Sequence, residues 1–137
     1  MRLFQKTKDG GPDSTVEAYF LFEIKWLCSI ALLKFNKGSR TNYHTHAFNA
    51  LTWFIKGSMT EIRLADLGQE LAEYRHSIIP KVTRKDNLHK VVAHKTSWCF
   101  TIRGPWDKHW KEVDLDAGIE YNLTHGRQVL STIEREK

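Results

Sequence analysis

Short apolar runs, in which hydrophobic and polar residues tend to alternate, dominate the pattern of the chain. Alternation with a period of two places one set of side chains on each face of a β-strand. Runs with this pattern, or with a strand-like composition, span 19–26, 29–35, 50–57, 59–65, 76–80, 89–94 and 97–104. Turn residues separate them at roughly regular spacing, and this arrangement predicts an all-β sandwich or barrel.

The connection between two of these runs indicates how they pair. The tripeptide KGS (56–58) leads from the run that begins at Ala50 into the run 59–65. A glycine in so short a connection is typical of a β-hairpin. We therefore expect these two segments to be antiparallel neighbours in one sheet.

The length of 137 residues fits one domain, 1–137. Its first 14 residues (1–14) include a Gly-Gly-Pro loop and are expected to form a partly flexible N-terminal arm. A short helix is expected only at the C-terminus, over 126–137. The longest apolar run, 27–33, is far shorter than the roughly 20 residues of a membrane span. The N-terminus also lacks the apolar stretch of a signal peptide, so we expect a cytoplasmic protein without membrane contact.

The charge of the chain gives little indication of a macromolecular partner. The net charge is +5, and the lysines and arginines are spread along the whole sequence. Nucleic-acid binding requires basic residues clustered on one face, so this distribution does not favour a nucleic-acid partner. A solvated basic surface explains the charge, and an anionic small ligand remains an alternative.

Two histidines, His44 and His46, stand two positions apart at the start of the run from Ala50. On a strand, residues i and i+2 point to the same side, so both imidazoles can converge on one point. Neutral imidazole is the commonest metal ligand in proteins. The alternative is a solvated pair at a strand edge, and a metal site needs at least one further donor from elsewhere in the fold.

The surroundings of this pair resemble the first conserved motif of the cupin superfamily, the RmlC-like jelly rolls. Gly38, His44, His46 and Gly57 stand in the order and spacing of that motif, and Pro80 followed by His89 is similar to the second motif. The core motifs would thus be 38–57 and 80–93. The resemblance implies a cupin-type double-stranded β-helix, a jelly-roll barrel, with His44, His46 and His89 as metal ligands.

The chain departs from the cupin pattern at one ligand. The glutamate of the first motif falls on Ala50 by spacing, and the nearest polar residue is Asn49. A three-histidine set leaves coordination positions open, as catalytic metals do, and adds no negative charge, which favours anionic substrates. It resembles the thiol dioxygenases among the cupins, which favours Fe(II); zinc, nickel and manganese remain open. Oxygenases that use 2-oxoglutarate need a carboxylate where this chain has His46.

The run 97–104 contributes candidate pocket residues. Trp98, Phe100 and Ile102 alternate with Cys99, Thr101 and Arg103. If the polar set faces the barrel interior, Arg103 can bind an anionic group in bidentate fashion. The apolar set is the slightly favoured candidate for the core.

The parity of the run that begins at Ala50 predicts which of its side chains reach the cavity. Thr52 shares the face of Ala50 and is expected to line the cavity, whereas Trp53 and Ile55 point the other way, toward a subunit interface. The cupin resemblance implies a homodimer. Asn49, Thr52 and Arg103 are therefore the candidate substrate-binding residues.

Three functions are compatible with these features. The first is a metal-dependent oxidoreductase, a non-haem iron dioxygenase or hydroxylase acting on a small molecule. The second is a non-catalytic jelly roll that binds a sugar or nucleotide. The third is a metal-independent epimerase or isomerase with a histidine base.

The segment 103–113 is also similar to one in small, often phage-encoded cupin-like proteins of unassigned role.

Overall fold

The computed structural model describes residues 2–9, 14–39, 43–65, 68–124 and 128–134, and these residues form two antiparallel β-sheets without a helix. One sheet contains β1 (Arg2–Lys8), β2 (Val16–Ile24), β3 (Cys28–Phe35), β11 (Ser97–Arg103), β6 (Ala50–Lys56) and β9 (Lys81–Thr83), in that spatial order. The second contains β14 (Gln128–Glu134), β13 (Ile119–Thr124), β12 (Trp110–Asp114), β5 (Tyr43–His44), β10 (His89–Ala93), β7 (Met59–Ala65) and β8 (Gly68–Tyr74), and β4 (Gly38–Ser39) also pairs with β10.

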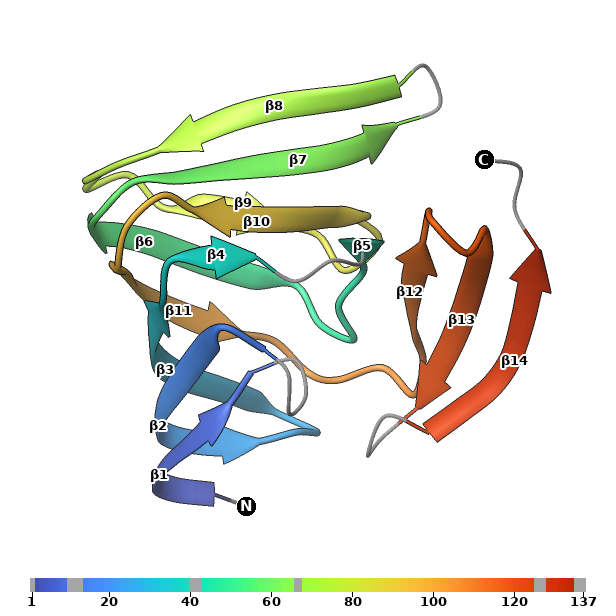
Figure 1. Ribbon diagram of the computed structural model, residues 1–137. Helices are drawn as coiled ribbons and strands as arrows, with labels where there is room; N and C mark the ends of the chain where they lie inside the picture. The colour runs from blue at the N-terminus through green and yellow to red at the C-terminus, as the bar shows by residue number, and fades with distance from the viewer. Residues whose placement is uncertain (1, 10–13, 40–42, 66–67, 125–127, 135–137) are drawn as a thin grey trace.

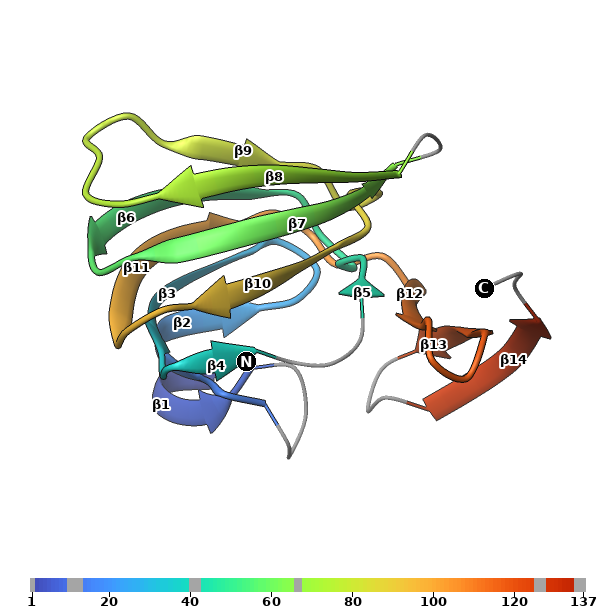
Figure 2. The same ribbon diagram turned by 45° about the horizontal axis from the view of Figure 1, so that its top comes forward.

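The two sheets lie face to face as a jelly-roll barrel, while β12, β13 and β14 stand to one side of it (Figures 1 and 2). The predicted all-β jelly roll is therefore confirmed. Among the described residues there is no helix with the length and apolar character needed to cross a membrane.

The predicted hairpin between 50–57 and 59–65 is wrong, although both strands exist. β6 pairs with β11 and β9 in the first sheet, whereas β7 pairs with β10 and β8 in the second. Gly57 has φ +119°, and Ser97 lies so close to its Cα that a Cβ there would be 2.1 Å from the Ser97 hydroxyl oxygen. The chain therefore passes from one sheet to the other at Gly57.

The strand predicted at 76–80 is also wrong. His76–Pro80 is irregular, because the Ser77 hydroxyl accepts a hydrogen bond from the Ile79 amide and donates to the Ile79 carbonyl, which closes a turn. Ile78 and Ile79 are exposed there. The apolar dipeptide thus lies on a surface turn and joins neither sheet.

The short helix predicted at 126–137 is wrong for the described part of that segment. Residues 128–134 form β14, which pairs with β13 from Ile119 opposite Glu134 to Thr124 opposite Gln128. This segment is a strand because its backbone pairs with β13, and the local sequence does not reveal that partner.

At the other end of the chain, β1 pairs with β2 along its length. Four residues of the loop expected there, 10–13, lie outside the described part, and the flexibility of the N-terminal arm remains a prediction.

The hydrophobic core lies between the two sheets. It consists of buried residues from both sheets, namely Ala18, Phe20, Ala31, Leu33, Phe54, Met59, Ala93 and Cys99. Phe54 of β6 stacks on Tyr74 of β8 with ring centroids 4.4 Å apart. Buried polar side chains, including His89, Thr101 and Arg103, share the interior with this core.

Candidate metal centre

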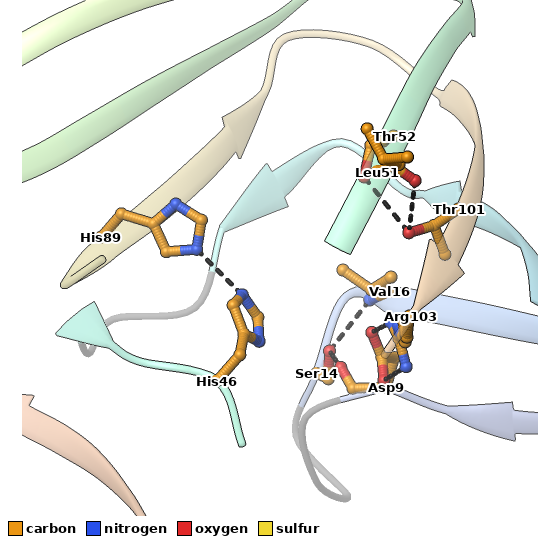
Figure 3. Close-up of polar contacts among 9 residues, drawn as sticks. All are labelled: Asp9, Ser14, Val16, His46, Leu51, Thr52, His89, Thr101 and Arg103. Carbon is orange, nitrogen blue, oxygen red and sulfur yellow. Dashed lines mark hydrogen bonds and ion pairs between the residues drawn. The ribbon is translucent and has the colours of Figure 1, made fainter. Parts of the chain in front are cut away.

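Three histidines meet on the inner face of the second sheet. His44 lies on β5, directly opposite His89 at the start of β10, and His46 follows β5 two residues later. One ligand nitrogen from each lies within 4.8 Å of the others. The Nε2 atoms of His46 and His89 are 3.0 Å apart (Figure 3). The structure thus brings together the three residues that the two sequence motifs indicate.

The spacing of these nitrogens fits a single metal ion. Two imidazole nitrogens that each bind an ion at about 2.1 Å lie roughly 3.0–3.5 Å from each other. The distance between His46 and His89 falls in this range, and the ligand nitrogen of His44 lies within 4.8 Å of both. A divalent ion would take the place of the hydrogen bond between these two Nε2 atoms. The cluster therefore fits a metal held by three neutral ligands.

Glu61 of β7 fixes the orientation of His89. Its side chain is buried and accepts a hydrogen bond from the Nδ1 of His89 over 2.6 Å, and it also accepts one from the Lys81 ammonium group. Burial opposes ionisation of Glu61, but the hydrogen bonds from His89 and Lys81 outweigh it and lower the pKa of Glu61 to about 2. The ionised carboxylate holds the proton of His89 on Nδ1 and leaves Nε2 free to bind a metal.

We expect Glu61→Gln to weaken metal binding by about 10- to 100-fold, as is typical when an outer hydrogen-bond partner of a ligand is lost. Glutamine keeps the shape of the side chain but removes the negative charge that accepts the hydrogen bond from the Nδ1 of His89. Competition with a fluorescent chelator for Zn²⁺ or Fe²⁺ measures the change. Glu73→Gln, on the exposed strand β8, is the matched control, and equal affinities in the two variants contradict this role of Glu61.

Asn49, the nearest polar residue to the missing glutamate, lies outside the histidine cluster. It is exposed, and its side-chain oxygen accepts a hydrogen bond of 2.8 Å from the Lys85 amide. Ala50 lines the cavity without offering a ligand atom. Glu61 is the carboxylate near the cluster that sequence reasoning missed. Its alternation with buried Met59 on one face of a strand was the available signal.

A cavity of about 450 Å³ lies between the histidines and the first sheet. Thr52 of β6 and Thr101 of β11 line it, and their hydroxyl oxygens are 3.2 Å apart. Figure 3 shows this pair across the interior from His46 and His89. The prediction that Thr52 faces the cavity is therefore confirmed, and the wall opposite the histidines includes a pair of hydroxyl groups.

The structure reverses the slightly favoured orientation of β11. Cys99, Thr101 and Arg103 are buried and line the cavity, whereas Trp98 and Phe100 lie on the outer side of the sheet. This polar face can lie in the interior because each of its groups either has a hydrogen-bond partner or is uncharged. Burial, for example, raises the pKa of the Cys99 thiol to about 12, which keeps it uncharged.

Arg103 already has an anionic partner. Its two terminal nitrogens donate hydrogen bonds to the two carboxylate oxygens of Asp9 over 3.2 and 2.6 Å (Figure 3). The guanidinium carbon also lies 4.7 Å from the centroid of the Phe48 ring. An anionic ligand would have to compete with Asp9 for this side chain.

Proteins similar to this chain are found among solved structures. No model of a protein family matches the chain, and no curated protein is similar to it. Among solved structures it is similar to an acetylacetone dioxygenase from Acinetobacter johnsonii, with 18% identity, a TM-score of 0.54 and coverage of 94% of this chain and 78% of that one.

Two other solved structures are similar. An RmlC-like cupin from Shewanella frigidimarina NCIMB 400 has 12% identity, a TM-score of 0.56 and coverage of 74% and 84% of the two chains. Oxalate decarboxylase from Bacillus subtilis has 11% identity and a TM-score of 0.54; the match covers 69% of this chain but spans only 26% of the decarboxylase. At these identities the likeness concerns the fold. The protein therefore has the cupin fold, a double-stranded β-helix in which the histidines of the two motifs meet inside the barrel.

Proposed function

We propose that this protein is a metal-dependent cupin enzyme, a mononuclear non-haem Fe(II) dioxygenase or hydroxylase that acts on a small molecule. The observation that supports it is the convergence of His44, His46 and His89 on one point beside a cavity. Three protein ligands leave coordination positions open for substrate and dioxygen, and a bound Fe(II) ion supplies the redox chemistry. The similarity in fold to a dioxygenase is compatible with this proposal. A cytoplasmic location belongs to the same proposal.

Different residues of the cavity would contact different parts of a substrate. Thr52 and the buried Thr101 offer hydroxyl groups opposite the histidines, and the aromatic side chains of Phe54 and Tyr74 offer an apolar surface farther in. Arg103 would bind an anionic group of the substrate if that group displaced Asp9. Asn49 would act from outside the cavity, through the loop that contains Lys85.

Metal content measured by mass spectrometry tests this function. Protein purified without a metal-affinity tag is expected to contain about one divalent ion per chain, to lose it to a chelator, and to regain it from Fe(II) under anaerobic conditions. Nitric oxide added to the Fe(II)-loaded protein then reports an open coordination position, because an iron–nitrosyl complex has a distinct electron paramagnetic resonance signal.

Other outcomes of this measurement would overturn the proposal. Protein without stoichiometric metal is not a metalloenzyme. Thermal stabilisation by a sugar or nucleotide that persists in chelator would indicate the binding module. Turnover in chelator would indicate epimerase chemistry with a histidine base.

A further inference from the structure

The inner face of the first sheet changes character from one pair of opposite residues to the next. Thr52 of β6 lies opposite Thr101 of β11 in the sheet register. Phe54 and Cys99 form the next pair on one side of these threonines, and Arg103 belongs to the next pair on the other side. All five side chains line the cavity. The threonine pair is therefore a polar element between an apolar region and a charged residue.

The hydrogen bonds of the threonine pair determine where its two hydroxyl protons lie. The hydroxyl of Thr101, a residue only 1% exposed, donates to the Leu51 carbonyl oxygen over 3.3 Å, because a carbonyl can only accept (Figure 3). A hydroxyl group has one proton, so the Thr101 oxygen must accept in its other contact, which joins it to the Thr52 hydroxyl over 3.2 Å. Thr52 therefore donates its own proton to Thr101, and its oxygen offers the cavity only lone pairs.

The cations beside the threonine pair are already bound to carboxylates. Both terminal nitrogens of Arg103 donate hydrogen bonds to Asp9. Lys81 of β9, which lies opposite Thr52 on its other side, donates a hydrogen bond to Glu61. A ligand must displace a carboxylate to take the place of Asp9 or Glu61, whereas the Thr52 oxygen can accept a further hydrogen bond without such a loss.

The apolar side of the threonine pair suits the hydrocarbon part of a ligand. Phe54 and Tyr74 line the cavity there together with Leu33 and Met59. The cavity volume of about 450 Å³ lies in the range of pockets that bind small organic molecules. Burial of apolar ligand surface against these side chains is favourable. An apolar body can therefore lie beside a polar group that reaches Thr52.

We propose that Thr52 determines substrate specificity by accepting a hydrogen bond, so that the substrate is a small molecule with an apolar body and a hydroxyl or N–H group that donates to the Thr52 oxygen. This inference rests on the proposed function, because it names the substrate class of the same site. An acceptor that faces a ligand without a donor loses the hydrogen bond that water would give it. A site built in this way discriminates against ligands that lack the donor.

Two pairs of aromatic probes of matched size test this requirement. Benzamide and phenol carry a donor, whereas acetophenone and fluorobenzene have a methyl group and a fluorine atom in its place. NMR titration of the full-length protein with excess Zn²⁺, which has no redox chemistry, gives the dissociation constants. Wild type is expected to bind the donor of at least one pair about 10-fold more tightly than its partner, which corresponds to one hydrogen bond.

Three variants assign this preference to one hydroxyl group. Thr52→Val keeps the shape of the side chain but removes the acceptor, so the two members of each pair should bind about equally. Thr52→Ser retains the acceptor and should retain the preference. Thr83→Val is the matched control, because Thr83 is a nearly buried residue that lines the same cavity; it should leave the preference unchanged. Circular dichroism verifies the fold of each variant.

Several results would overturn the proposal. These are no binding of any probe, no preference within either pair, a preference for the probes without a donor, a preference that persists in Thr52→Val, and one that Thr83→Val removes. A preference that the metal itself causes would persist in Thr52→Val. Absence of stoichiometric metal would contradict the proposed enzyme but would leave the effect of Thr52→Val intact, so the two failures are distinguishable.

Discussion

His46→Ala is expected to abolish stoichiometric metal binding. With two ligands left, the affinity should fall by well over the roughly 100-fold that loss of an outer hydrogen-bond partner costs. His46 contributes its Nε2 atom 3.0 Å from that of His89, so its removal opens one side of the site. Metal content by mass spectrometry and the thermal shift on adding metal both measure the effect. At about 100 times the dissociation constant, a metal stabilises the wild type by about 2.7 kcal/mol, which corresponds to about 10 °C in a domain of this size.

The chain contains a suitable control for this variant. His94 is exposed and bonds the Thr60 hydroxyl group over 2.6 Å, away from the cluster. His94→Ala should therefore retain both the metal and the thermal shift. If His46→Ala binds as much metal as His94→Ala does, the three-histidine centre is not the metal site.

Gly57→Ala is expected to destabilise the protein by about 4 kcal/mol or more, the range in which single substitutions are exceptional. Two costs combine at this position. Any side chain at φ +119° is strained, by about 1–3 kcal/mol, and a Cβ would lie 2.4 Å from the Cβ of Ser97 and 2.6 Å from its Cα. Ser97 cannot move easily, because it is fully buried and its hydroxyl accepts a hydrogen bond from the Ser58 amide over 3.0 Å.

Gly68→Ala separates these two costs. Gly68 has φ +127°, close to that of Gly57, but nothing lies within 4 Å of the added Cβ. It should show the backbone strain alone. Urea denaturation of both variants gives the difference in the free energy of unfolding, and an equal loss of stability at the two glycines would show that the contact with Ser97 costs nothing.

The sequence predicts the strands better than it predicts their partners. β6 and β7 stand close to where alternation places them, but the glycine between them suggests a hairpin, since a tight turn and a corner between sheets use the same residue type. The distinction depends on Ser97, forty residues later, whose backbone occupies the space beside Gly57. No local pattern contains that contact.

Several strands escaped prediction, and for β8 and β14 the reason is that their composition is not that of a half-buried strand. β8 includes Gln69, Glu70 and Glu73, all exposed, and it pairs with β7 at the edge of the sheet. β14 is exposed at all seven positions, so packing against a core does not determine which residues it contains. In both cases the backbone hydrogen bonds to a neighbour determine the structure.

The candidate ligands followed from motif spacing, whereas their environment did not. Glu61 lies fifteen positions after His46, and it approaches His89 because β7 and β10 are neighbours in the second sheet. The orientation of β11 was misjudged for a related reason. Alternation separates its two faces but does not say which of them lines a polar cavity and which lies on the outer side of the sheet.

One of the two shortest strands, β5, has two roles. β5 consists of Tyr43 and His44, and His44 pairs with His89 on one side and with Glu112 of β12 on the other. The C-terminal strands thus join the barrel through a residue that is also a candidate ligand (Figure 1). Coordination at His44 would therefore stabilise the pairing of β5 with β12, and loss of the ion would weaken the attachment of β12, β13 and β14 to the barrel.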